Sequence, residues 1–267
     1  MTGRLYLENR PHVPDVYGGV IRVTGTGIFH HGDGGERTQI MPETTAAVLV
    51  GGGCTVSSAA VRSIVEGGAQ LIWLSKTGLK VEAVTPAPTG SSLALLERQA
   101  RLVDPALRRA VAVRSLAARF GEEPPGSYSE NQLRGWEGAK VRAVYITEAD
   151  RRGFRWSKRV NDTKSDLLNS LISACNASIY TAVHAGLLAL NMSPHLGWLH
   201  AGEHAAVFDF AEHYKLDLSI GRVFDWFAAR DRDSPLPSSF AFARQQLPET
   251  VLNVFSSLHT LADEVPP

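Results

Sequence analysis

The chain has 267 residues, of which 44% are hydrophobic, so it can bury a substantial core as one large domain or two moderate ones. Its two cysteines, Cys54 and Cys175, lie far apart and outside any C-x-x-C pattern, which excludes a disulfide scaffold and a zinc ribbon. No apolar run approaches the ~18 residues of a membrane span, and the polar N-terminus lacks the apolar segment of a signal peptide. We therefore expect a cytoplasmic protein that works without a membrane.

The net charge is zero, but the charges are unevenly distributed. Residues 91–160 carry an excess of six positive charges, and residues 161–267 carry an excess of six negative charges. Within the basic part, the segment RRGFRWSKR places Phe154 and Trp156 between its cations. Such a segment can bind a polyanion, with its aromatic rings available for stacking, although a solvated basic loop has the same composition.

The first part of the chain has the pattern of a small β domain. Residues before 84 are rich in β-branched side chains and turn signals, which predicts short antiparallel strands. The segments expected as strands are 4–9, 19–25, 38–40, 46–50 and 70–75. One helix is predicted at 57–66, with Ser57 as its N-cap and Gly67 at its end. The GGGC stretch that starts at Gly51 lacks the Gly-Lys-Ser/Thr of a phosphate loop and predicts a tight turn.

The uncharged, proline-rich segment VTPAPTGSS separates two differently patterned parts and is the best linker candidate. After it, helical periodicity continues to the end of the chain. The predicted helices are 92–120 with a bend at Asp104-Pro105, 129–148, 164–190, 204–216, 222–231 and 237–262. The predicted fold class is α+β with two domains: an N-terminal β domain at residues 1–84, a linker at 85–92 and a larger all-α domain at 93–267.

A glutamate on an apolar helix face is the first candidate for chemistry. The capping-box pattern S-x-x-Q at the start of the second predicted helix fixes its register, and Glu137 then points along the apolar stripe that contains Leu133. A buried carboxylate must be paired, protonated or bound to a metal, because an unpaired buried charge costs several kcal/mol. Gly135 and Gly138 flank it, which would let a backbone or a ligand come close. An ion pair with Lys140 is the structural alternative.

The stretch GWLHAGEHAAVFDFAEHYK contains a second group of candidates. On one continuous helix His200 and Asp209 would face opposite sides, because nine residues correspond to about 900° of rotation. A helix that begins near His204, with Gly202 at the break, instead leaves His200 in a loop that can fold over the helix. Asp209 and Glu212 then lie together, facing away from the core, as a pair of carboxylates suited to a hard cation.

Together, Glu137, His200, Asp209 and Glu212 offer oxygen ligands and one imidazole, a set that suits Mg²⁺ or Mn²⁺ better than zinc. Such an ion can polarise a phosphodiester while the basic segment holds the polyanion. The competing interpretation is a zinc peptidase, because His200-Ala-Gly-Glu-His204 fits H-x-x-E-H. That motif requires an unbroken helix and a third ligand, and the downstream acidic residues show no supporting pattern.

The sequence resembles the CRISPR-associated integrase family, the universal spacer-acquisition enzymes, and most of all their type I-E branch. The similarity runs over nearly the whole chain. Its most specific pieces are AAVRSIVEGGAQLIWLSKTGLKV (59–81), ENQLRGWEGAKVRAVY (130–145), SIYTAVHAGLLALNMSPHLGWLHAG (178–202) and VFDFAEHYK (207–215). Departures from the family pattern are Thr55 in place of an arginine, an extra acid at Glu203, and short segments before Asn169 and at the C-terminus. They bear on DNA grip and partner contacts rather than on the chemistry.

The resemblance implies an N-terminal β-sandwich-like domain and a helical catalytic domain with a metal site. By motif, the ligands of its Mg²⁺ or Mn²⁺ ion fall on Glu137, His200 and Asp209, and Glu212 takes the place of a further acidic catalytic residue. The family's DNA-binding positions fall on Arg62, Lys80, Arg134, Arg142, Tyr180 and Lys215.

The implied function is the insertion of short DNA fragments, the prespacers, at the repeat of a CRISPR array. In this reaction the 3′-hydroxyl of a fragment attacks a phosphodiester directly, without a covalent enzyme intermediate. The implied assembly is a homodimer joined by a small ferredoxin-like partner of the adaptation machinery. Two alternatives stay open at this point: a stand-alone metal-dependent nuclease for branched DNA, and a non-catalytic DNA-binding scaffold.

Overall fold

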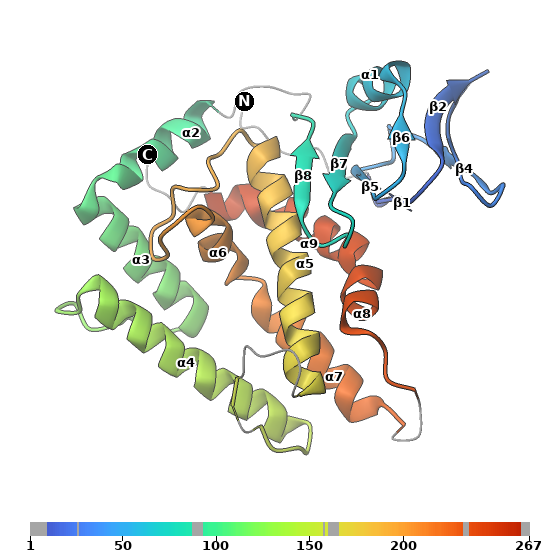
Figure 1. Cartoon of the computed structure of the whole chain (residues 1–267). Helices are drawn as coiled ribbons and strands as arrows, with labels where there is room; N and C mark the ends of the chain where they lie inside the picture. Colours follow the sequence, from blue (N-terminus) through green and yellow to red (C-terminus); the bar gives the residue numbers. More distant parts are fainter. Residues whose placement is uncertain are drawn as a thin grey trace.

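A computed structural model describes residues 10–25, 27–86, 93–156, 158–159, 166–231 and 235–262. In this part of the chain the strands precede residue 85, and all helices but one follow residue 92 (Figure 1). The protein therefore has an α+β fold, as the sequence predicts. The predicted strand at 4–9 and most of the predicted linker at 85–92 lie outside the described residues.

Two four-stranded sheets form the N-terminal part, with the strand orders β1-β5-β7-β8 and β4-β3-β2-β6. Their strands are β1 (Asp15–Val16), β2 (Val20–Thr24), β3 (Gly27–His31), β4 (Arg37–Ile40), β5 (Ala47–Val50), β6 (Thr55–Val56), β7 (Gln70–Leu74) and β8 (Val81–Val84). The expectation that the strands are antiparallel is wrong for β1 with β5, β5 with β7, and β2 with β6, which pair in parallel. Helix α1 (Ser58–Glu66) lies between β6 and β7 and carries the chain back, so that β7 can run parallel to β5.

The strand β5 is covered on both faces and contributes to two cores. Val48 and Val50 pack with residues of the second sheet and with Ile64 of α1, in a core enclosed by the two sheets and this helix. Ala47 and Leu49 join the core of the helical part instead. Successive side chains of a strand point to opposite faces, so a strand buried on both sides reads as a continuous apolar run.

The described chain beyond residue 92 is helical. Its helices are α2 (Leu93–Ala100), α3 (Pro105–Phe120), α4 (Glu130–Arg151), α5 (Leu167–Ala189), α6 (Ala205–Ala211), α7 (Arg222–Ala229), α8 (Ser239–Gln245) and α9 (Leu247–Ala262). The bend expected at Asp104 is present, because the Asp104 carboxylate caps α3 by accepting from the amide of Ala106 (2.8 Å). The single helix predicted at 237–262 is two helices, and Pro248 lies in the first turn of the second, where its missing N–H is tolerated.

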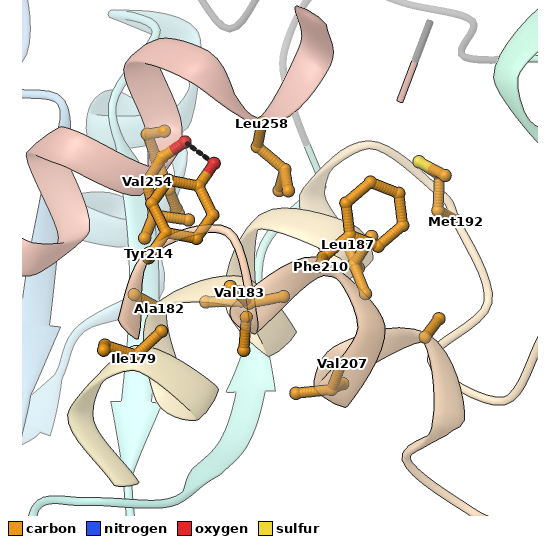
Figure 2. Close-up of a cluster of buried hydrophobic side chains, with 14 of the residues drawn as sticks. Ile179, Ala182, Val183, Leu187, Met192, Val207, Phe210, Tyr214, Val254 and Leu258 are labelled. Atoms are coloured by element: carbon orange, nitrogen blue, oxygen red, sulfur yellow. Dashed lines mark hydrogen bonds between the residues drawn. The ribbon is translucent and has the colours of Figure 1, made fainter. Parts of the chain in front are cut away.

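Helix α5 runs through the centre of the helical part and contacts α6, α8 and α9 (Figure 1). Figure 2 shows Ile179 and Val183 of α5 in one apolar cluster with Val207 and Phe210 of α6 and Leu258 of α9. By length and hydropathy α5 could cross a membrane, although it has no unbroken apolar run; 72% of its apolar window is buried inside the protein. Its apolar character is therefore that of a core helix.

A contact between an arginine and a tyrosine joins the sheets to the helices. The Arg244 guanidinium of α8 lies over the ring of Tyr17, with 3.3 Å from Cζ to the ring centroid. Tyr17 packs directly against Gly51, where a side chain would collide with the ring, so the GGGC stretch is the tight turn that the sequence predicts. Burial, together with the neighbouring charge of Asp15, raises the pKa of Tyr17 to about 12 and keeps the phenol neutral.

Candidate active site

A cavity of about 560 Å³ opens between α4, α5 and the segment that follows α6. Six of the predicted catalytic and DNA-binding residues line it: Arg134, Glu137, Arg142, Tyr180, Glu212 and Lys215. Its wall also contains Tyr145 and Trp156, whose rings stack with 4.9 Å between centroids, and the cations of Lys158 and Arg159. Acidic, basic and aromatic side chains from distant parts of the sequence therefore share one space.

Two acids of the cavity are joined by a buried arginine that the sequence analysis did not place in the site. Arg119, at the end of α3, donates from Nη1 to Glu137 Oε1 and from Nη2 to Glu212 Oε2, the latter at 2.8 Å. All three side chains are about 10% exposed. The alternative ion pair of Glu137 with Lys140 is not formed, because Lys140 pairs with Glu122.

The position of Arg119 in its helix is a signal that could have identified it. The buried residues of α3 are Val111, Ala112, Ser115 and Leu116. Arg119 follows Leu116 by three residues and Ser115 by four, and therefore continues the buried stripe of the helix. A cation on a buried stripe requires an acid nearby, as Glu137 on its stripe requires a cation.

The second oxygen of Glu212 is also paired with a cation. Lys215 Nζ donates to Glu212 Oε1, and the same ammonium lies over the Tyr180 ring, 5.0 Å from its centroid. Burial alone would raise the pKa of Glu212, but the charges of Lys215 and Arg119 outweigh it and hold that pKa below its usual value. Glu212 is therefore a carboxylate with a cation on each oxygen.

The Asp209 carboxylate organises the loop that precedes α6. Its Oδ2 accepts from the amides of Trp198 (2.5 Å) and Leu199 (3.0 Å), and its Oδ1 accepts from the amide of His200 (3.0 Å). Gly197 permits this wrapping, because a side chain there would collide with Oδ2. The sequence expects Asp209 to face away from the core; in the structure the loop covers its carboxylate, and 3% of the residue is exposed.

The loop brings His200 onto Asp209, as the predicted helix break requires. Helix α6 begins at Ala205, His204 is its N-cap, and Gly202 has a φ of +102°, which favours glycine. The imidazole Nδ1 then lies 2.7 Å from Asp209 Oδ1. With its Nδ1 bonded to the carboxylate, the ring is held so that Nε2 is the nitrogen left for a ligand.

The charge of His200 depends on Asp209 and on the two acids of the cavity, Glu137 and Glu212. Burial lowers its pKa, but the hydrogen bond and charge of Asp209, with further contributions from Glu137 and Glu212, raise it above the ordinary value overall. This coupling links the His200–Asp209 pair to the carboxylates of the cavity. The zinc-peptidase geometry is not present, because His200 and His204 do not share a helix and the ring of His204 packs edge-on against that of His184.

Two predicted DNA-binding residues lie elsewhere. Arg62 and Lys80 are exposed and do not line the cavity, which leaves their role a prediction. Gly135 and Gly138 have nothing within 4 Å of an added Cβ, so no backbone approaches them, but Gly138 lines the cavity and leaves room for a ligand.

Replacing the Asp209 carboxylate tests the loop geometry. We expect Asp209→Asn to lower the free energy of unfolding by about 2–4 kcal/mol, because an amide turned toward the loop N–H groups leaves buried donors unsatisfied. Urea denaturation followed by circular dichroism measures this change. Asp217→Asn, at an exposed carboxylate, is the control and should change stability by less than about 0.5 kcal/mol. If the Asp209→Asn protein is as stable as the control, the loop amides do not depend on the Asp209 carboxylate.

A pH dependence of stability follows from His213, whose Nε2 lies 3.0 Å from Ser115 Oγ. Burial, and then the charge of Arg119, lower its pKa to about 4 from an ordinary 6.5. A lowered pKa in the folded state stabilises the fold above pH 6.5, and this contribution, about 3 kcal/mol, is lost as the pH falls toward 4.

The corresponding experiment compares His213→Gln with the wild type by urea denaturation between pH 6.5 and 4, in EDTA. We expect the variant to lose about 3 kcal/mol less stability over that range, because it lacks the group that must take up a proton. His195→Gln, at an exposed histidine, should follow the wild-type pH profile. Identical profiles for His213→Gln and the wild type would show that His213 is not buried as a neutral ring.

Comparisons with known proteins identify the family to which the chain belongs. The sequence model of the family described as CRISPR associated protein Cas1 matches residues 15–124 and 121–230. The CRISPR-associated endonuclease Cas1 of Escherichia coli (strain K12) is 33% identical over 238 residues, 87% of this chain and 75% of that protein. The same enzyme of Geobacter sulfurreducens is 31% identical over 86% of this chain and 74% of that protein. The crystal structure of the TtCas1–DNA complex superposes with a TM-score of 0.70 at 26% identity, covering 97% of this chain and 98% of that one. The chain belongs to the Cas1 family of CRISPR-associated proteins.

Proposed function

We propose that this protein is a divalent-cation-dependent DNA integrase and endonuclease of CRISPR adaptation. The observation that carries the proposal is the cavity in which Glu137 and Glu212 face a wall of cations and stacked aromatic rings. Carboxylates of this kind serve phosphoryl transfer, and the surrounding cations match a polyanionic substrate. The relatives named as endonucleases and the relative crystallised with DNA support this interpretation.

The chemistry of the donors fits a Mg²⁺ or Mn²⁺ ion held by Glu137, His200 and Glu212. These residues offer two carboxylates and an imidazole whose Nδ1 is already bonded to Asp209. Asp209, a ligand in the sequence prediction, has its oxygens turned to three amides and to His200, so we now assign it to orient that ring. No group of three or more His, Cys, Asp or Glu side chains is already arranged to hold a metal ion in the described ranges, where Arg119 and Lys215 pair with Glu212.

When bound, such an ion would polarise the phosphodiester and stabilise the charge of the transition state. The 3′-hydroxyl of the incoming fragment gives its proton to solvent and forms the new P–O bond, the P–O3′ bond of the repeat strand breaks, and the released 3′-oxygen takes up a proton from solvent. Arg134 and Arg142 are assigned to the flanking phosphates, because both are exposed at the cavity wall. The Arg134 Nε also donates to Leu199 O (2.9 Å), which ties the DNA contact to the loop of His200.

The remaining parts of the proposal come from the family resemblance. We propose that the DNA bound is a prespacer together with the CRISPR repeat, and that the active unit is a homodimer joined by a small ferredoxin-like partner in the cytoplasm. The Arg62 and Lys80 positions would contact DNA outside the cavity. Hydrolysis of branched DNA uses the same site with water in place of the 3′-hydroxyl, and the similarity to relatives named as endonucleases favours it as a second activity.

The first test removes one acid of the cavity. We expect Glu137→Gln to reduce joining of a 3′-hydroxyl fragment to a repeat-containing plasmid at least about 100-fold with Mn²⁺, because a charged ligand is lost. Its DNA affinity, measured in EDTA, should stay within about twofold of the wild type. The matched control is Glu122→Gln, an exposed glutamate that pairs with Lys140 and lies outside the cavity wall. Unchanged joining by Glu137→Gln would locate the chemistry elsewhere.

The second test concerns DNA affinity. We expect affinity for a forked duplex to fall steeply between 50 and 200 mM salt, because each neutralised phosphate releases counterions. Arg142→Ala should weaken binding and flatten the salt slope by about one unit, whatever the DNA sequence. Arg114→Ala, at an exposed arginine of α3 outside the cavity wall, is the control for general charge. Fluorescence anisotropy measures both, and equal effects of the two variants would count against the cavity as the DNA site.

A further inference from the structure

The acid pair of the cavity is fully neutralised by the protein's own cations. Glu212 has Arg119 on Oε2 and Lys215 on Oε1, and Arg119 also holds Glu137. Two buried carboxylates therefore face one guanidinium and one ammonium. A divalent cation that binds Glu212 meets a positive charge beside each oxygen, so displacing one of these two contacts removes a repulsion that opposes its binding.

The two cations are held in different ways. Arg119 is about 10% exposed, forks across both carboxylates, and does not line the cavity. Lys215 is 17% exposed, lines the cavity, and has one acid and the face of the Tyr180 ring as neighbours. A guanidinium fixed by two acids loses more on leaving than an ammonium on a flexible four-carbon stem. The contact that can exchange is the one of Lys215.

We propose that Lys215 is an exchangeable counter-ion that couples cation binding to DNA binding. In the DNA-free protein its ammonium occupies Glu212 Oε1. A DNA phosphate in the cavity draws the ammonium away, and Glu212 Oε1 becomes available to the divalent cation. The inference rests on the proposed function, and it adds an order of events that the proposed function does not contain.

Electrostatics favours an exchange over a simple departure. The Lys215 side chain is only 17% exposed, so an ammonium that left Glu212 without another anion would remain uncompensated in a mostly buried place. A phosphate supplies that anion at the open side of the cavity, while Arg119 continues to hold the two acids together. The coupling is reciprocal, since DNA must improve cation affinity by the factor by which the cation improves DNA affinity. Couplings of this kind are typically about 5- to 150-fold.

The first measurement is Mn²⁺ affinity of the full chain without DNA, from the electron paramagnetic resonance signal of free Mn²⁺. We expect Lys215→Gln to bind Mn²⁺ at least about tenfold more tightly than the wild type, because the competing ammonium is gone. Lys215→Arg keeps a cation on Glu212 and should bind as weakly as the wild type. Lys140→Gln removes a lysine that is paired with Glu122 outside the cavity and is the control for general charge. Thermal unfolding of each variant verifies that it is folded.

The second measurement adds a short duplex with single-stranded, 3′-dideoxy ends, which prevent strand transfer. DNA should tighten Mn²⁺ binding to the wild type about tenfold, after correction for Mn²⁺ bound by the duplex alone. The same DNA should change the Mn²⁺ affinity of Lys215→Gln by less than about twofold. The proposal is overturned if, without DNA, the Mn²⁺ affinity of Lys215→Gln lies within twofold of that of the wild type. It is also overturned if DNA tightens Mn²⁺ binding equally in the variant and the wild type.

Glu137→Gln, measured in parallel, separates the two levels of failure. Loss of Mn²⁺ binding in Glu137→Gln together with an unchanged Lys215→Gln would retain the metal site and reject the exchange. Undiminished Mn²⁺ binding in Glu137→Gln would reject the site itself, and the exchange with it.

Discussion

One buried guanidinium fixes the relative positions of three helical segments around the cavity. Arg119 extends from the end of α3, Glu137 from the middle of α4, and Glu212 from the residue after α6. Each segment contributes a side chain whose charge is too costly to bury alone. The bridge makes the burial of the two acids possible, and it ties α4 to the segment that follows α6. The free protein therefore presents its acids already close together.

The His200 side of the site is held by backbone amides that bind a carboxylate, rather than by a pair of charged side chains. Three consecutive amides, from Trp198 to His200, converge on Asp209, and this arrangement needs both the bare backbone of Gly197 and the left-handed conformation of Gly202. A carboxylate that accepts several amides is a rigid anchor, because moving it would leave buried N–H groups unsatisfied. His200 inherits that rigidity, while the charge environment around Lys215 stays adjustable. In our proposal the site combines a fixed imidazole with an acid, Glu212, whose counter-ion can exchange.

Much of this could be predicted from the sequence wherever a local rule decided the outcome. Glycine chemistry placed the start of α6, and the helical period placed Glu137 on a buried stripe, both of which the structure confirms. The sequence did not show what other segments contribute: the amides that surround the oxygens of Asp209, the arginine that pairs with Glu137, and the parallel pairing of β5 with β7. Helical periodicity describes one element at a time and carries no information on what covers its other faces. The metal, the dimer and the ferredoxin-like partner rest on family resemblance and stay predictions.

The two faces of β5 have a consequence for how the protein unfolds. Leu49 of β5, Ile72 of β7 and Val81 of β8 belong to the same apolar cluster as the helices. This cluster lies on the far side of the sheet from the core that the two sheets form with α1. Neither part of the chain closes its core alone, so the helical part separated from the sheets would expose a continuous apolar surface. The protein is therefore expected to unfold as one cooperative unit, with cleavage near residues 85–92 leaving two pieces that remain associated. In this molecule the boundary in the sequence pattern is not a boundary in the energetics of folding.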